Sequence, residues 1–260
     1  MRALSLVTVL SVVLLALSLP AAAQENAALE GLPEAPQARY DAAQEQAVTS
    51  RNQGDYAAAL ALYEEMQRLA PGSGEIAYNR GVVLLDMERH QAADAAFSQA
   101  RELGLDNAAV HYNQGNARYR AGQYAAATDA YRSARERAPQ DPEILTNLGL
   151  SLQFQDDPEG AQEAFEAAAA ADPAWAVSLF HLGNMFYDQG AYEQAEGAYS
   201  EALQREPELR QARFNRGNAR YQMGSYRAAF DDFLVLHQQN PDDTDILYNL
   251  GASAVAAAEQ

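Results

Sequence analysis

The chain has 260 residues, a formal charge of −18 at pH 7 and no cysteine, and all of its basic residues are arginine. So acidic a protein is a poor ligand for nucleic acid or anionic lipid, because both attract positive patches, and neither is expected as a partner. The absence of cysteine excludes disulfides, so packing alone must hold the fold. The acidity fits a solvated, self-repelling surface; adaptation to salt and a preference for a basic partner are the alternatives.

The N-terminal segment has the pattern of a secretory signal peptide. Arg2 precedes an apolar run over 3–19, and alanines at 21–23 follow it. A basic start, an apolar core and an A-x-A site predict cleavage after Ala23, which leaves no stable membrane insertion. The expected location is the periplasm of a bacterium, with secretion to the medium second. An uncleaved membrane anchor is the alternative. The length of the apolar run favours cleavage over an anchor, because about 17 residues is the short limit for a membrane span.

From residue 40 onward the sequence repeats with a period of 34 residues. A glycine recurs in copies two to six and in a partial copy after them, followed in most copies by an alanine, an aromatic residue and a proline at fixed offsets; copy one has Ala47 in place of the glycine. The glycines are Gly81, Gly115, Gly149, Gly183, Gly217 and Gly251. The six copies are 40–73, 74–107, 108–141, 142–175, 176–209 and 210–243. A fixed period of this length indicates a stack of similar structural units.

Each copy is predicted to fold as two antiparallel helices. In the fifth copy, apolar residues recur at helical spacing over 176–189 and again over 192–206. Gly190 interrupts the two runs, and Pro207 ends the second, because proline lacks the N–H that a helix needs. We expect the small residues of the two helices to lie where their backbones approach, with the aromatic residue filling the adjoining gap.

These marks resemble the tetratricopeptide repeat (TPR) family, which carries a small residue, Ala, an aromatic, Ala and Pro at fixed offsets. The fifth copy matches the pattern with Gly183, Ala195, Tyr199, Ala202 and Pro207. The resemblance covers residues 40–260. It implies an all-α, right-handed α-solenoid of six helix hairpins, the TPR superhelix, with the first helix of each copy lining a concave groove.

The ends of the array differ from its middle. Residues 24–39 are predicted to be a flexible tether, and residues 244–260 a partial repeat that serves as a capping helix.

Copy two departs from the repeat pattern: Leu105 replaces the proline and Glu88 replaces the turn glycine. The joint from copy two to copy three is therefore expected to be looser than the others.

The sequence contains no recognisable catalytic or metal-binding pattern. Its four histidines fall at different repeat positions, and it has no H-E-x-x-H motif, phosphate-binding glycine loop or nucleophile elbow. We therefore expect no enzymatic activity, no cofactor and no metal site.

The resemblance implies that repeat positions 2, 5, 9, 12 and 13 point into the groove. In copies three, five and six, these positions present an aromatic residue, an asparagine and a tyrosine on successive turns of one helix. Tyrosine provides rigid contact area, and asparagine can donate to and accept from a peptide backbone. Plain packing of these side chains is the alternative. The candidate partner-binding residues are Tyr78, Tyr112, Asn116, Tyr119, Arg120, Phe180, Asn184, Tyr187, Phe214, Asn218, Tyr221 and Tyr248.

Charged residues refine this prediction. TPR domains that clamp a C-terminal carboxylate place a lysine where this chain has Tyr112 or Phe180, so that mode of binding is not expected. Arg216 and Arg220 share one helix face. We expect them to pair with acidic residues of a neighbouring helix, or alternatively to mark an acidic spot on a partner.

The predicted function is that of a non-enzymatic scaffold of the bacterial cell envelope, which binds a protein or extended peptide in its groove. The alternative is an accessory subunit of an envelope enzyme or of a secretion or assembly complex. Residues 112–119 also look like the TPR subunits of aerotolerance-type operons. The sequence assigns neither a partner nor an oligomeric state.

Overall fold

The computed structural model describes residues 34–260, and within them all regular structure is helical. The predicted signal segment 1–23 and residues 24–33 of the predicted tether lie outside the described residues. The first helices of the six copies are α2 (Glu34–Asn52), α4 (Gly74–Asp86), α6 (Ala108–Arg120), α8 (Pro142–Gln153), α10 (Val177–Asp188) and α12 (Arg210–Gln222). The second helices are α3 (Tyr56–Leu69), α5 (His90–Glu102), α7 (Tyr124–Arg137), α9 (Pro158–Ala171), α11 (Tyr192–Arg205) and α13 (Tyr226–Gln239). The last helix is α14 (Thr244–Ala258).

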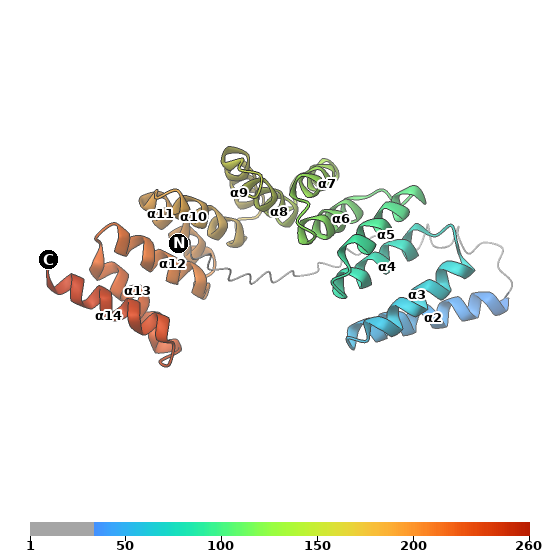
Figure 1. Ribbon diagram of the computed structural model, residues 1–260, viewed down its shortest axis with the longest axis horizontal. Helices are drawn as coiled ribbons and strands as arrows, with labels where there is room; N and C mark the ends of the chain where they lie inside the picture. The colour runs from blue at the N-terminus through green and yellow to red at the C-terminus, as the bar shows by residue number, and fades with distance from the viewer. Residues whose placement is uncertain (1–33) are drawn as a thin grey trace.

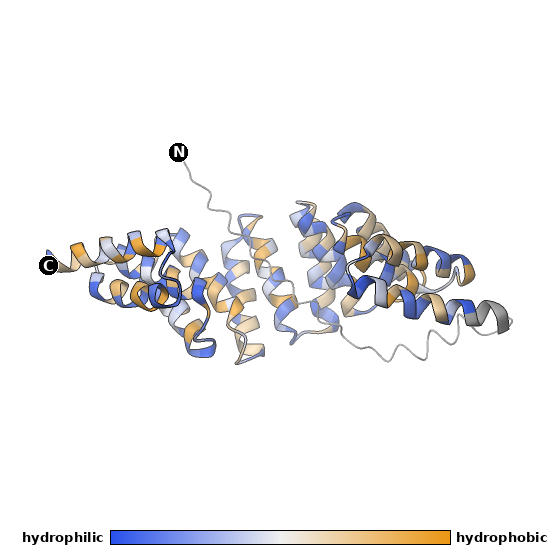
Figure 2. Cartoon of the chain, turned by 90° about the horizontal axis from the view of Figure 1, so that it is seen from below, coloured by the Kyte–Doolittle hydropathy of each residue, from blue (hydrophilic) through white to orange (hydrophobic). Residues whose placement is uncertain are grey.

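The helices stack into an arch that runs from α2 at one end to α14 at the other (Figure 1). In the middle of the arch, α6 and α8 lie on its inner side and α7 and α9 on its outer side. Apolar and polar residues alternate along every helix in Figure 2, as expected for helices that bury one face against their neighbours. The predicted all-α solenoid of helix hairpins is confirmed.

The first helix begins earlier than the repeat frame indicates. Residues 34–39, assigned to the flexible tether from sequence, form the first turns of α2. Pro36 does not prevent this, because the first four N–H groups of a helix have no partner within the helix and a proline there removes no hydrogen bond. Pro36 is therefore compatible with a helix that starts at Glu34.

Side chains at the repeat junctions fix where many helices begin. Asp141 caps α8 by accepting from the backbone N–H of Ile144 at 3.1 Å, and Asn107 caps α6 by accepting from Val110 at 3.0 Å. Such caps satisfy backbone donors at the helix start and each contributes about 1 kcal/mol. The period in the sequence therefore coincides with real helix boundaries.

The turn inside each hairpin requires a left-handed residue. Gly122 holds this place in copy three with φ 75°, whereas Glu88 in copy two and Asp156 in copy four adopt φ 58° and φ 56° without being glycine.

Copy two joins copy three closely, because Leu105 is buried in the core that the two copies share. The expectation of a looser joint there is wrong: leucine replaces the proline by filling the junction.

A glycine and an aromatic ring meet in the centre of each hairpin of copies two to six. The glycine of the first helix lies under the ring of the second, so that a methyl group on the glycine would be 2.5–2.7 Å from a ring carbon. Such a distance is too short for any real contact, so only glycine fits. The pairs are Gly81–Phe97, Gly115–Tyr131, Gly149–Phe165, Gly183–Tyr199 and Gly217–Phe233. The predicted role of the small and aromatic residues is confirmed.

Candidate partner-binding surface on the inner face

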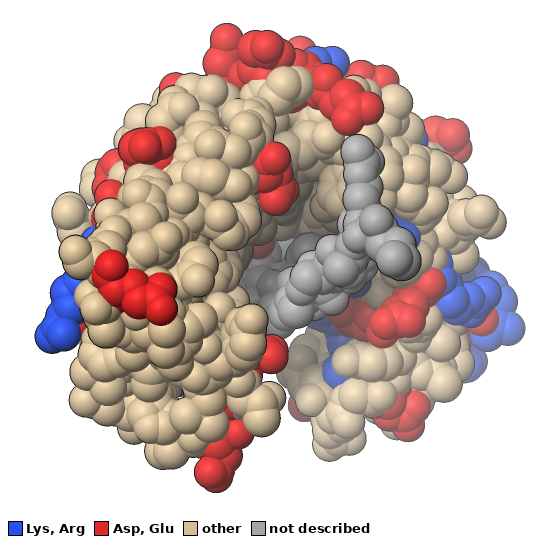
Figure 3. All heavy atoms as spheres, turned by 60° about the vertical axis from the view of Figure 1, so that its left-hand side comes forward, with Lys and Arg blue, Asp and Glu red and all other residues tan. Residues whose placement is uncertain are grey.

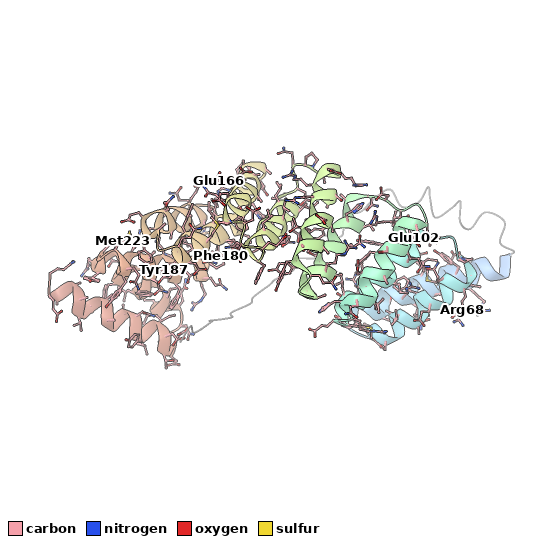
Figure 4. The ribbon with its side chains drawn as sticks, turned by 45° about the horizontal axis from the view of Figure 1, so that its top comes forward. Arg68, Glu102, Glu166, Phe180, Tyr187 and Met223 are labelled. Atoms are coloured by element: carbon pink, nitrogen blue, oxygen red, sulfur yellow. The ribbon has the colours of Figure 1, made fainter. Side chains whose placement is uncertain are left out.

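The predicted groove residues belong to the first helices, so the solenoid brings them to one side of the arch. In Figure 4, Phe180 and Tyr187 of α10 lie along its lower, inner edge, and Glu166 of α9 lies at the opposite, outer edge. The aromatic residue at repeat position 5 is half-buried in copies two, three, five and six, because its ring packs against the aromatic ring of the second helix. The centroid distances are 5.8 Å for Tyr78–Phe97, 6.1 Å for Tyr112–Tyr131, 6.2 Å for Phe180–Tyr199 and 5.6 Å for Phe214–Phe233.

In the first half of the array these aromatic residues also link neighbouring copies. The hydroxyl of Tyr78 accepts a hydrogen bond from Asn113 Nδ2 at 3.0 Å, and the hydroxyl of Tyr112 accepts one from Asn147 Nδ2 at 2.9 Å. Tyr112 also hydrogen-bonds the carboxyl group of Glu143, and burial raises the pKa of that carboxyl. These hydroxyl groups therefore contribute to the spacing of copies two to four.

The asparagines at repeat position 9 are engaged within their own copy. Asn116 Oδ1 accepts from the hydroxyl of Tyr131 at 2.7 Å, and Asn184 Oδ1 accepts from Tyr199 at 2.7 Å. Asn116 is only 7% exposed. Asn116 therefore takes part in the packing of its hairpin, because its carbonyl oxygen satisfies a buried phenol.

Asn218 differs from the two equivalent asparagines. The aromatic residue above Gly217 is Phe233, which has no hydroxyl group. Asn218 therefore does not make the bond that holds Asn116 and Asn184. Its amide is half-buried on α12, beside the half-buried ring of Phe214.

Tyrosines at the end of the first helix and the start of the second meet across each of three hairpin turns. The ring centroids are 5.3 Å apart for Tyr119–Tyr124, 5.3 Å for Tyr187–Tyr192 and 5.0 Å for Tyr221–Tyr226. Burial, followed by the neighbouring Tyr124, raises the pKa of Tyr119 to about 12. Tyr119 therefore remains neutral at ordinary pH. Together the tyrosines present a row of amphipathic rings along one edge of the arch.

A residue that the sequence analysis missed completes the most exposed part of this row. Phe154 of α8's C-terminus stacks on Tyr124 with centroids 4.3 Å apart and planes 12° apart, and contacts the edge of Tyr119 at 5.7 Å. It is 57% exposed. The sequence feature that could have identified Phe154 is an aromatic residue at repeat position 13, where the other copies have polar residues. Copies three, five and six carry Arg120, Asp188 and Gln222 there.

Two of the predicted contacts are well exposed. Arg120 lies at the end of α6, and Tyr248 of α14 is 76% exposed. The twelve predicted residues thus lie on the first helices and on α14. They fall into three groups: residues packed within a hairpin, tyrosines at the hairpin turns, and exposed side chains. Their role as partner contacts stays a prediction.

The arginines of copy six form an ion-pair cluster instead of a free basic patch. Arg216 binds Asp232 of α13 with two bonds of 2.6 Å and 2.9 Å, and Arg220 bridges Asp232 at 2.8 Å and Glu196 of α11 at 2.7 Å. The prediction that these arginines pair with acidic residues of neighbouring helices is confirmed.

His181 is the titratable group whose protonation the fold opposes most clearly. Its ring stacks on Phe165 at 5.8 Å and contacts Phe180 at 5.3 Å. Burial lowers the pKa of His181 to about 4, because an imidazolium in this apolar site would lose its hydration. Copies two, three, four and six carry asparagine at this position.

We expect His181 to make the protein less stable in mild acid. The unfolded chain takes up a proton near pH 6.5 and the folded chain near pH 4, so the stability is complete above pH 6.5 and decreases below it, by about 2 kcal/mol between pH 6.5 and pH 5. His181→Asn should lose this part of the pH dependence. Urea unfolding of both proteins at the two pH values checks it; equal decreases would contradict it.

The visible face in Figure 3 carries many acidic side chains and fewer basic ones. Among residues 34–260 there is no cluster of side chains suited to hold a metal ion. No helix in the same range is both long enough and apolar enough to cross a bilayer.

Models of the TPR and tetratricopeptide repeat families match residues 45–93, 78–142, 142–174 and 183–224, together more than half of the chain. No curated protein sequence matches significantly. The fold resembles that of PilF from Pseudomonas aeruginosa, with 18% identity, a TM-score of 0.66, and coverage of 87% of this chain and 100% of that one.

Two further solved structures show the same likeness. A TPR protein from Parabacteroides merdae has 17% identity and a TM-score of 0.67, with 85% of this chain and 88% of that chain covered. YrrB, described as a TPR protein with an unusual peptide-binding site, has 22% identity and a TM-score of 0.56, with 64% and 86% covered. Identities this low establish the fold and no more. With the matched repeat models and the glycine–aromatic hairpins, they lead to one conclusion: the chain belongs to the tetratricopeptide repeat family.

Proposed function

We propose that this protein is a non-enzymatic scaffold that binds a protein segment along the inner edge of its arch. The observation that carries the proposal is the aromatic cluster of Tyr119, Tyr124 and Phe154. A stacked phenylalanine that remains 57% exposed provides apolar contact area on a rigid support. Rigid aromatic side chains lose little conformational entropy on binding, which makes them efficient anchors for a partner.

The wider family supports the same proposal. The similar protein YrrB is described as having a peptide-binding site. The described part of this chain offers no metal cluster, and its polar inner residues are largely engaged in holding neighbouring helices together. A row of half-exposed tyrosines suits an extended segment, because each ring can contact apolar side chains while its hydroxyl bonds to a backbone.

The expected location is the bacterial envelope. The support is the sequence of residues 2–23, with its basic start, apolar run and A-x-A site. Mass spectrometry of the protein recovered from its host should find Gln24 as the first residue. Intact Met1 on protein from the soluble cytoplasmic fraction would contradict export.

The binding proposal is tested by truncating the exposed anchor. Phe154→Ala should weaken capture of the main partner from an envelope extract by about tenfold or more, because the partner loses its largest apolar contact. The helical circular dichroism signal should stay unchanged, since Phe154 packs only on the surface. Quantitative mass spectrometry of the captured proteins gives the ratio.

A matched control lies on the outer face. Glu166 is exposed at the outer edge of α9 (Figure 4), and Glu166→Ala should leave capture unchanged. If Phe154→Ala binds normally and Glu166→Ala loses the partner, the partner uses the outer face and the assignment of the inner edge is wrong.

A further inference from the structure

The last helix, α14, exposes a face that, in the first helix of every complete copy, is covered by the second helix of the hairpin. Leu247 of α14 is 43% exposed, whereas the equivalent leucines Leu145 and Leu179 are 3% and 5% exposed. Tyr248 beside it is 76% exposed, although the equivalent aromatic residues of copies two, three, five and six each pack on a ring. Within residues 34–260, no second helix covers this face of α14.

Gly251 shows most clearly what this face lacks. Each of the five equivalent glycines lies under an aromatic ring, but a methyl group on Gly251 would have no atom within 4 Å. Around Gly251 lies an open depression of about 550 Å³, lined by Tyr221 of α12 and by Leu247, Tyr248 and Val255 among others. At the left end of Figure 2, apolar residues run along this helix up to the C-terminus.

We propose that this depression, here called the α14 socket, binds an amphipathic helix of a partner protein that inserts a phenylalanine or tyrosine over Gly251. The five hairpins of copies two to six define the occupant, because in each of them the same arrangement of glycine and neighbouring apolar residues receives one aromatic ring from an antiparallel helix. This surface is separate from the aromatic cluster at Phe154 and goes beyond the proposed function.

Charge adds a second requirement on the partner. Residues 238–260 contain Asp242, Asp243, Asp245 and Glu259 and no arginine or lysine. The first three lie at or just before the start of α14, and Glu259 follows its end and lines the socket, so both ends of α14 are acidic. A helix with basic residues at its ends is therefore favoured over an acidic one.

The segment before the described residues does not supply the occupant. Residues 1–33, which lie outside the described structure, contain no phenylalanine, tyrosine or tryptophan. The second-helix rings of a second copy are buried in their own hairpins at 0–3% exposure, and the copy would have to open a hairpin to lend one. Its most exposed ring, Tyr248, lies on α14 itself and not on a second helix, so a separate partner helix fits the α14 socket better.

The test uses a probe peptide with the sequence of residues 124–137, a second helix with Tyr131 as its ring and three arginines. A staple between positions 125 and 129, both exposed on α7, keeps the short peptide helical. Fluorescence anisotropy with the purified full chain should show saturable binding. The same peptide with Tyr131→Ala should bind at least about tenfold more weakly.

Gly251→Ala should reduce the affinity of the protein for the probe by about tenfold or more, because its methyl group occupies the place of the ring. The fold should not suffer, since that methyl group meets no atom within 4 Å. Gly197→Ala is the matched control: Gly197 is also helical, exposed and without a neighbour within 4 Å, but lies on α11. It should bind the probe like the unchanged protein.

Equal binding by the Gly251→Ala and Gly197→Ala proteins, or no binding of the stapled peptide by the unchanged protein, would overturn the proposal. A dimer in sedimentation analysis that Gly251→Ala converts to a monomer would also overturn it, because a second copy would then cover the α14 socket.

Discussion

Phe165→Ala should cost about 4 kcal/mol of unfolding free energy, the largest loss expected from a single truncation in this array. The ring is 0% exposed and lies over Gly149, which has no side chain that could fill the space it leaves. The cavity would therefore persist, and its walls would lose both the transferred apolar surface and their packing contacts. Urea unfolding followed by circular dichroism measures the loss.

The same chemical change at Phe154 is the control. Phe154 is 57% exposed and stacks on one face only, so Phe154→Ala should cost about 1 kcal/mol. Equal losses at the two positions would show that the ring above the glycine is not a special support of the hairpin.

A double variant makes the interpretation sharper. Gly149→Ala alone should destabilise the protein by about 1–3 kcal/mol, because its methyl group would lie 2.6 Å from the ring of Phe165. In the Phe165→Ala protein the same change should raise the stability by about 1 kcal/mol, since alanine is the better helix former and the ring is gone. If the effect of Gly149→Ala does not change sign, the close contact between glycine and ring is not what requires glycine here.

Local regularities explain why the fold could be predicted from the sequence. Each glycine and its covering ring are separated by the same number of residues in five copies, so Gly149 and Phe165 could be paired without knowing the distance between their helices. The ion pairs of Arg216 and Arg220 were predictable in kind for a similar reason, because residues four apart share a helix face.

The hydrogen bonds of the groove side chains could not be predicted in the same way. Asn116 is hydrogen-bonded to Tyr131 and buried, although its repeat position indicated a groove residue. Whether an asparagine at this position is hydrogen-bonded within its hairpin depends on whether the ring above the neighbouring glycine carries a hydroxyl group. Tyr131 has one and Phe233 does not. The start of α2 at Glu34 was missed because Pro36 looked like a helix breaker, and a proline in the first turn is not one.

The second large effect is expected at Asp232 of α13. Its side chain is almost fully buried and binds Arg216 with two hydrogen bonds and Arg220 with one, and Arg213 lies 3.9 Å away. Asp232→Ala would leave these arginines close together with no central carboxylate. We expect a loss of about 3 kcal/mol, at the lower end of the range for a broken buried pair because the arginines keep some contact with water.

The adjacent residue provides a control with the same substitution on the same helix. Asp231 is exposed, and its ion pair with Arg227 spans 3.6 Å on the helix surface, so Asp231→Ala should change the stability by less than about 0.5 kcal/mol. Helix propensity changes equally in both variants, and the difference between them therefore measures the buried cluster alone. Urea unfolding of the two proteins decides the matter. Equal stabilities would mean that Arg216 and Arg220 turn outward to water when Asp232 is removed, and that the cluster does not hold copies five and six together.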